Sequence, residues 1–229
     1  MDASVSPFAI KICGLSTPET LRAALDAGVE MIGLVFHPKS PRFVSEAQAA
    51  ELAAMARGRA EIVALIVDRD IGEIRDLVAG LRPDWLQLHG RETPTQVGAI
   101  KAATGLRAMK AIGIAGEQDL TAITPYLGVA DRILLDAKPP QDAAYPGGHG
   151  RPFDWTLLAQ LDPAIGFMLS GGLDRANVAE AIRIARPSGV DVSSGVESAP
   201  GRKDAGRITD FVVAARAAAQ TMHEEAGRT

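Results

Sequence analysis

The sequence predicts an α/β fold, a single (β/α)8 or TIM barrel, and two observations support this. Short apolar segments recur roughly every 29 residues, and stretches with helical signals separate them, as in an eightfold barrel. The apolar segments are rich in Ile, Val and Leu with little polar alternation, which is typical of parallel strands buried on both faces. The eight expected strands cover residues 8–12, 31–36, 61–67, 84–89, 106–112, 131–136, 166–170 and 189–193.

Two of the intervening segments carry clear helix boundaries. Thr17 precedes Pro18 at a first helical position, and Gly28 follows the end of the same segment. Asp174 is the expected N-cap of the helix after the seventh strand. An open, doubly wound sheet is the alternative fold, but no Gly-rich dinucleotide turn follows the first strand.

The domain organisation is expected to be simple. No linker or composition shift divides the chain, so we expect one barrel domain over residues 1–229, with a short N-terminal extension at 1–7 and a polar tail at about 220–229. The irregular segment 137–153 follows strand six and is rich in Pro and Gly. A loop of this length in a compact domain usually has a function.

Composition excludes several classes of partner. The net charge of −4 argues against general affinity for nucleic acid or for an anionic membrane. The N-terminus lacks signal-peptide features, no run approaches the ~18 apolar residues of a membrane span, and one cysteine cannot form an internal disulfide. We therefore expect a cytoplasmic protein with no nucleic-acid or membrane partner.

The glycine-rich ends of strands seven and eight predict a phosphate site. Barrel enzymes place their chemistry at the carboxyl ends of the strands, and the loops after strands seven and eight often hold a phosphate. Backbone amides at such turns, with a helix dipole behind them, bind anions without a basic side chain. The alternative is that these glycines only form tight turns. The candidate residues for a phosphorylated small-molecule substrate are Gly171, Gly172, Ser194 and Gly195.

Two carboxylates and one guanidinium stand at or near other strand ends. Asp136 ends a buried run and is either a general acid or base or the cap of a turn. Asp191 lies inside strand eight, where an unpaired carboxylate is costly, so we expect it to accept hydrogen bonds from substrate or backbone. Arg42 follows strand two and is either a surface charge or a clamp on an anionic ligand.

Cys13 ends the first strand and is either a small buried hydrophobe or a reactive thiol. Lys11, two residues earlier, points to the same side and should lower the pKa of the thiol. The histidines are His37 and His149 in loops, His89 at the end of strand four and His223 in the tail. Their spacing suits no metal, so we expect no metal site.

An ordered set of motifs links these residues to a known family. The segments KICG, SPR, QLHG, LLD, GGHGRPFDW, LSGGL and DVSSGVES followed by GRKD occur in this order, each at an expected strand end. From about Ile10 to Phe211 the chain resembles phosphoribosylanthranilate isomerase, an enzyme of tryptophan biosynthesis. In one departure, His149 stands where the family motif has threonine.

The resemblance implies an Amadori rearrangement that needs neither cofactor nor metal. N-(5'-phosphoribosyl)anthranilate would become 1-(2-carboxyphenylamino)-1-deoxyribulose 5-phosphate, with Cys13 as general base and Asp136 as general acid. Arg42 would face the anthranilate carboxylate, the four glycine and serine positions would hold the phosphate, and His89 and Asp191 would contribute to substrate binding.

Three alternative functions use different residues. A related histidine-pathway isomerase has an aspartate in place of Cys13. A decarboxylating or ring-closing synthase would need a catalytic Lys–Glu set, which the strand ends do not clearly offer. A barrel that only binds phospholigands would not need both Cys13 and Asp136. The resemblance leaves open whether the protein is a monomer or a homodimer.

Overall fold

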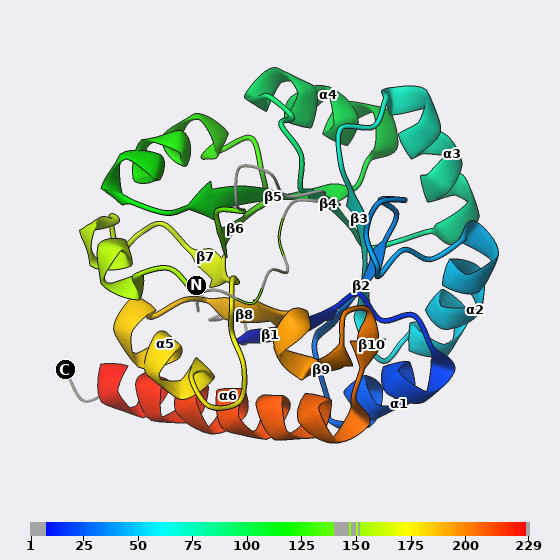
Figure 1. Cartoon of the computed structure of the whole chain (residues 1–229). Coiled ribbons are helices and arrows are strands. Elements are labelled where there is room, and N and C mark those ends of the chain that lie inside the picture. Colours follow the sequence, from blue (N-terminus) through cyan, green and yellow to red (C-terminus); the bar gives the residue numbers. More distant parts are fainter. Residues whose placement is uncertain (1–7, 140–146, 148–149, 151, 228–229) are drawn as a thin grey trace.

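The computed structural model describes residues 8–139, 147, 150 and 152–227. Its eight parallel strands close into a barrel in sequence order, and β1 pairs with β8 to complete the ring (Figure 1). The strands are β1 (Ala9–Cys13), β2 (Met31–Val35), β3 (Glu61–Ile66), β4 (Trp85–Leu88), β5 (Arg107–Ile114), β6 (Arg132–Ala137), β7 (Phe167–Leu169) and β8 (Gly189–Val192). The predicted fold class is confirmed.

The α-helices surround the barrel, and polar N-caps begin most of them. They are α1 (Pro18–Asp26), α2 (Glu46–Ala56), α3 (Ile71–Leu81), α4 (Pro94–Thr104), α5 (Val178–Ala185) and α6 (Ala205–Ala226). The Thr17 hydroxyl accepts from the Thr20 amide at 3.3 Å, and Pro18 occupies the first helical position, as predicted. Ser45 and Thr93 form capping boxes, which satisfy amides that have no partner within the helix.

The strict alternation of strand and α-helix is interrupted at two places. Within the described residues, the connection from β5 to β6 contains only the 3-10 turns η1 (Glu117–Ala122) and η2 (Thr124–Tyr126), and the connection from β6 to β7 contains only η3 (Trp155–Gln160). Pro125 in η2 lacks the amide that a longer helix would need.

One predicted helix boundary near the C-terminus, the N-cap at Asp174, is wrong. α5 begins at Val178, because the Asp174 carboxylate instead accepts from the amides of Ala176 and Asn177 at 2.8 and 3.0 Å and caps the preceding turn. The residues of the expected polar tail up to Ala226 continue α6, and the prediction of a polar tail is not contradicted by this. α6 packs along α1 and α5 (Figure 1).

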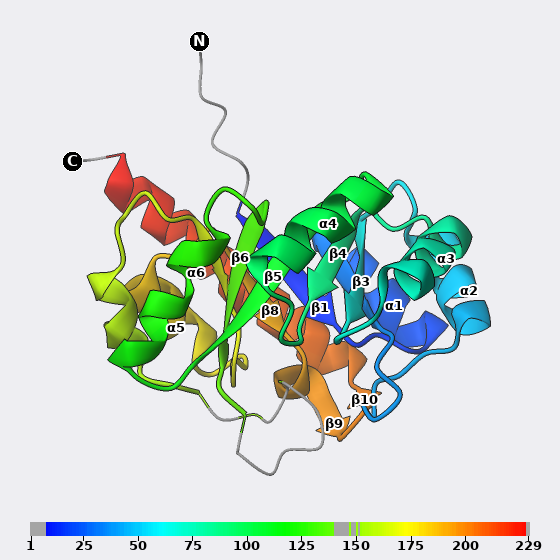
Figure 2. The same cartoon turned by 90° about the horizontal axis from the view of Figure 1, so that it is seen from above.

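A short hairpin between β8 and α6 was not predicted. The turn η4 (Ser194–Val196) leads into β9 (Glu197–Ala199), which pairs antiparallel with β10 (Arg202–Lys203). The hairpin lies at the end of the barrel away from the start of β1 (Figure 2).

The barrel interior changes from apolar to polar along its axis. Its apolar layer consists of Ala9, Met31, Val63, Trp85, Met109, Ala111, Leu134 and Met168. Further along the strands, the fully or almost fully buried Lys11, Gln87 and Asp191 point inward. The apolar layer therefore closes one end, and the polar residues lie beneath the strand carboxyl ends. Among the described residues no helix is both long and apolar enough to cross a membrane.

Candidate active site

A cavity opens at the carboxyl ends of the strands. Eight of the nine predicted site residues line it, from seven different strands and loops: Cys13, Arg42, His89, Asp136, Gly171, Gly172, Asp191 and Ser194. Gly195 follows Ser194 in η4 but is not part of the lining. The structure thus brings together residues that are far apart in the sequence.

Cys13 lies at the carboxyl end of β1, with only 4% of its surface exposed. Gly33 on the neighbouring strand provides room for its thiol, since a Cβ there would lie 2.9 Å from Sγ. The Lys11 ammonium donates to Asp191 Oδ1 at 2.9 Å, and both side chains are buried. Asp191 therefore has a partner other than the backbone or substrate partners we expected.

The predicted lowering of the Cys13 pKa is wrong in its net direction. Burial raises the pKa of the thiol, and it outweighs the lowering by the Lys11 ammonium. Asp191 adds to the rise because its negative charge opposes a thiolate. A second ammonium, Lys203, acts in the lowering direction, and burial holds the pKa of Lys203 itself at about 8.

Arg42 is held in a buried ion-pair cluster with two residues that sequence reasoning did not single out. Its Nε and Nη2 donate to Glu197 Oε1 and Oε2 at 2.7 and 3.0 Å, and the residue is only 5% exposed. It is therefore not a surface charge. Gly14, with φ of +78°, leaves room for the side chain, since a Cβ there would lie 2.7 Å from Arg42 Cδ. Lys203 also contacts Glu197, at 2.7 Å.

Glu197 stays ionised between these two cations. Burial alone would raise the pKa of its carboxyl, but hydrogen bonds from Arg42 and Lys203 and their charges bring it below the usual value. Glu197 and Lys203 stand in the motif that follows strand eight, and the signal that could have identified them is charged residues in a short segment next to the barrel mouth. Lys203 also donates to the Ser193 carbonyl and hydroxyl at 2.9 and 3.1 Å.

Asp136 has a different set of neighbours. Its Oδ2 lies 3.2 Å from His89 Nε2, and its Oδ1 accepts from the Ala137 amide at 2.8 Å. A Cβ at Gly147 would lie 2.6 Å from Asp136 Oδ2, so backbone without a side chain passes directly beside the carboxylate. His149, which stands where the family motif has threonine, lies outside the described residues.

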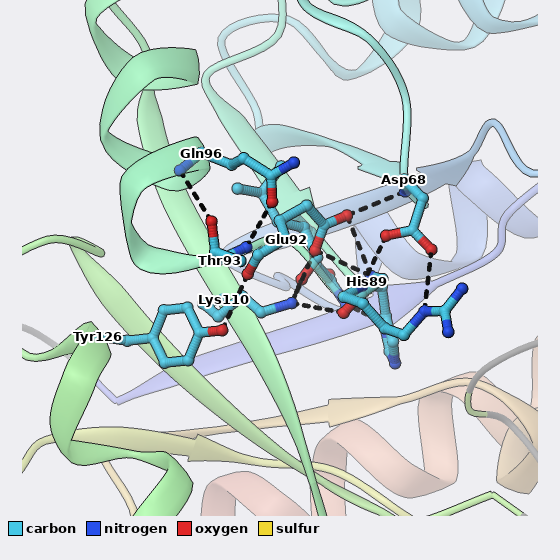
Figure 3. A network of polar contacts seen from close by, with 11 residues as sticks. Asp68, His89, Glu92, Thr93, Gln96, Lys110 and Tyr126 are labelled. Atoms are coloured by element: carbon cyan, nitrogen blue, oxygen red, sulfur yellow. Dashed lines mark hydrogen bonds and ion pairs between the residues drawn. The ribbon is translucent and has the colours of Figure 1, made fainter.

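The chain on either side of His89 is fixed by a buried ion pair that was not predicted (Figure 3). Lys110 and Glu92 pair at 2.7 Å with 3% and 5% of their side chains exposed. The Lys110 ammonium also donates to the carbonyls of Leu88 and Gly90 at 3.2 and 2.7 Å, and Glu92 accepts from the Gly90 amide at 3.1 Å. The pair thus anchors the main chain before and after His89.

The turns after β7 and β8 lie close together and expose backbone amides. Gly171 has φ of +88°, and a Cβ there would collide with the backbone nitrogen of Ala137. A Cβ at Gly195 would collide with the Leu173 carbonyl oxygen. In the part of the chain that the structure describes, the amides of Gly171 and Gly172 donate to no other protein group. Such turns have the geometry and the free donors of an anion site.

Of the other two histidines that the structure describes, one lines the cavity and one does not. His37 lines the cavity, and burial together with nearby Lys39 lowers its pKa, which favours the neutral imidazole. His223 is exposed on α6, far along the chain from the lining residues. No group of three or more His, Cys, Asp or Glu side chains among the described residues is arranged to hold a metal ion.

Comparison with known proteins assigns the family. The model of the family described as N-(5'-phosphoribosyl)anthranilate (PRA) isomerase matches residues 10–214. The chain belongs to this family. It is 56% identical over 212 residues to the N-(5'-phosphoribosyl)anthranilate isomerase of Afipia carboxidovorans, covering 93% of this chain and 91% of the relative. It is also 56% identical over 215 residues to that of Nitrobacter hamburgensis, with 94% and 96% covered.

Solved structures of the isomerase family have the same fold. The phosphoribosyl anthranilate isomerase of Thermotoga maritima superposes with a TM-score of 0.83 at 34% identity, covering 92% of this chain and 99% of that one. An isomerase in complex with reduced 1-(o-carboxyphenylamino)-1-deoxyribulose 5-phosphate gives a TM-score of 0.81 at 31% identity with the same coverage. The family resemblance found in the sequence is confirmed, and with it the (β/α)8 barrel.

Proposed function

We propose that Cys13 and Asp136 are the base and the acid of the isomerisation that defines this family. The chain is an intramolecular isomerase of tryptophan biosynthesis, converting N-(5'-phosphoribosyl)anthranilate into 1-(2-carboxyphenylamino)-1-deoxyribulose 5-phosphate. The observation that supports the assignment is that a thiol from β1 and a carboxyl group from β6 line the same cavity. The two strands are separated in the ring by β7 and β8, so the two groups approach a ligand from different directions.

The chemistry requires one proton donor and one proton acceptor. Asp136 protonates the furanose ring oxygen, the bond from this oxygen to C1' breaks, and a protonated Schiff base forms. The Schiff base acidifies the C2' proton, which the Cys13 thiolate removes to give an enol, and the enol then relaxes to the ketone. The substrate nitrogen accepts the electrons, so we propose that no cofactor and no metal takes part.

We assign each of the two charged ends of the substrate to a part of the cavity that can bind an anion. We assign the phosphate to the turns that contain Gly171, Gly172, Ser194 and Gly195, because backbone amides without a protein acceptor favour an anion there. We assign the anthranilate carboxylate to the cavity wall formed by Arg42, whose guanidinium Glu197 holds in a fixed plane through two hydrogen bonds.

The proposal also includes the cellular location and the oligomeric state of the enzyme. The biosynthetic reaction suggests a cytoplasmic location. One Thermotoga maritima isomerase is described as dimeric, and for this chain a monomer or a homodimer stays the prediction.

A direct assay tests the proposed function. Freshly prepared phosphoribosylanthranilate should lose its anthranilate-type fluorescence when the protein is added, at a rate that EDTA leaves unchanged. No turnover by the folded protein would contradict the proposed function. Loss of turnover in EDTA, with recovery on adding a divalent metal, would contradict its metal-free chemistry.

A further inference from the structure

We propose that the proton given to the ring oxygen is shared by Asp136 and His89, and that Gln87 is a positioning residue which selects the protonated nitrogen of the imidazole. The inference rests on the proposed function, in which Asp136 is the acid. Gln87 comes from β4, is fully buried and lines the cavity.

The three side chains form a continuous line. Gln87 Nε2 lies 3.0 Å from His89 Nδ1, and His89 Nε2 lies 3.2 Å from Asp136 Oδ2. The second atom of the amide, Gln87 Oε1, is buried without a hydrogen-bond partner among the described residues. A buried amide atom without a partner costs about 1–3 kcal/mol, so its position in the cavity wall indicates a ligand group that completes it.

The orientation of the Gln87 amide decides where the imidazole carries its proton. If the amide nitrogen donates to Nδ1, a neutral His89 carries its proton on Nε2 and donates it to Asp136. Both oxygens of Asp136 then accept hydrogen bonds, since Oδ1 already accepts from Ala137. In this arrangement both carboxylate oxygens are acceptors, and the carboxylate has no proton to give.

A half-turn of the amide about its Cγ–Cδ bond produces the arrangement that the reaction needs. Gln87 Oε1 then accepts from Nδ1–H, and Nε2 of the imidazole faces Asp136 with a lone pair. One proton lies between Nε2 and Oδ2, as a neutral carboxyl group or as an imidazolium, and either form can release it. The amide nitrogen then occupies the buried position that Oε1 held before the half-turn, and there it donates to an oxygen of the sugar chain.

The surroundings hold this line rigidly. A Cβ at Gly147 would lie 2.6 Å from Asp136 Oδ2 and 2.9 Å from His89 Nε2, so only a glycine fits beside the shared proton. The ion pair of Lys110 with Glu92 fixes the main chain on both sides of His89 (Figure 3). The main chain that carries the imidazole is therefore fixed beside Asp136.

The proton balance closes over one turnover. The pair of Asp136 and His89 gives its proton to the ring oxygen as the bond to C1' breaks, and it regains one from the C2' hydroxyl when the enol becomes the ketone. Cys13 takes the C2' proton and returns it to C1'. Each group ends the cycle as it began, so no co-reactant is needed.

Nitrogen NMR of the wild-type protein tests the inference directly. Two-bond ¹⁵N–¹H correlation spectra of the imidazole rings distinguish a protonated Nδ1 from a bare one, and comparison with His89→Asn assigns the signals. We expect His89 to carry a proton on Nδ1 near neutral pH. A bare Nδ1 with the proton on Nε2 would overturn the inference.

Two substitutions of Gln87 supply a kinetic test. Gln87→Met removes the acceptor, and it should lower kcat by ~10-fold or more with KM within about twofold, since a misplaced imidazole proton impairs proton transfer. Gln87→Glu keeps an acceptor for Nδ1–H and should retain more of kcat than Gln87→Met. Met109→Leu, a change in the apolar layer of the same barrel interior, is the control for repacking and should leave kcat unchanged.

The outcomes separate the inference from the function beneath it. A normal kcat in folded Gln87→Met, beside an inactive Asp136→Asn, would contradict only the role of Gln87. A normal kcat in Asp136→Asn would contradict the proposed acid itself. If the Gln87 variants do not fold, the spectra of the wild-type protein decide the question.

Discussion

The two proposed proton-transfer groups occupy contrasting halves of one cavity. Cys13 lies among buried charges, because Lys11 and Asp191 pair within the barrel and Lys203 acts on the thiol from the hairpin. Asp136, by contrast, is beside an imidazole and the backbone of glycines 147 and 171. The base is therefore controlled by charge and burial, and the acid by hydrogen bonds and close packing.

Cys13 and Asp136 therefore respond to different features of the cavity. Around Cys13, burial raises the pKa of the thiol, and the ammonium groups of Lys11 and Lys203 limit that rise. Around Asp136, the arrangement of donors selects which atom holds the proton. Substitutions near Cys13 should alter how activity depends on pH and charge. Substitutions near Asp136 should alter activity by moving the hydrogen-bonding groups around the carboxylate.

The largest expected effect comes from removing the thiol. Cys13→Ser should reduce kcat by ~10²–10⁴-fold with little change in KM, because a serine hydroxyl is far less acidic than a thiol and supplies almost no base near neutral pH. Measuring kcat together with the melting temperature separates this from a packing role. A folded variant with near wild-type kcat would make Cys13 a packing residue and leave the mechanism without a base.

The phosphate turn should respond through binding. Gly172 has φ of +66° and lines the cavity at the turn that we assign to the phosphate. Gly172→Asp adds bulk, strain and a like charge, so KM should rise ~10- to 100-fold, the equivalent of losing one charge-assisted hydrogen bond of about 1.5–3 kcal/mol. An unchanged KM in a folded variant would exclude this turn as the phosphate site.

A smaller effect, on the reactivity of the Cys13 thiol, should come from replacing Lys203 on the hairpin. Lys203→Met removes a positive charge that lowers the pKa of Cys13, so the thiol pKa should rise further and alkylation by iodoacetamide at a fixed pH should slow several-fold. In the wild-type protein Lys203 loses its charge as pH rises through about 8, so the charge on which this effect depends is present below that pH. Lys101→Met is a matched control, because it breaks a partly exposed ion pair with Asp131 elsewhere on the surface. Equal alkylation rates in Lys203→Met and wild type would show that the ammonium does not act on the thiol.

The sequence predicts the fold and most of the cavity lining because both follow from local patterns. All eight strands lie within two residues of their expected ends, since apolar runs and turn signals mark them. Parallel strands in a closed barrel then bring their carboxyl ends together, which places Cys13, His89 and Asp136 in one cavity.

The errors concern interactions between distant segments. Asp191 pairs with Lys11, 180 positions away, and Arg42 pairs with Glu197, 155 positions away, so neither partner can be read from spacing along the chain. The direction of the Cys13 pKa shift failed for the same reason, because it depends on the depth of burial and on Asp191 as well as on Lys11. Gln87 contacts His89 within the same segment, and it gains its proposed role only because His89 in turn contacts Asp136 from another strand.

A deuterium isotope experiment tests the separation of acid and base most directly. Substrate deuterated at C2' is compared with ordinary substrate for Cys13→Ser and for Asp136→Asn, using single-turnover rates. In Cys13→Ser the removal of the C2' proton should limit the rate, so a large primary isotope effect is expected. In Asp136→Asn ring opening should limit the rate, so the two substrates should react almost equally fast. A large isotope effect in Asp136→Asn together with none in Cys13→Ser would contradict the assignment of Cys13 as the base and Asp136 as the acid.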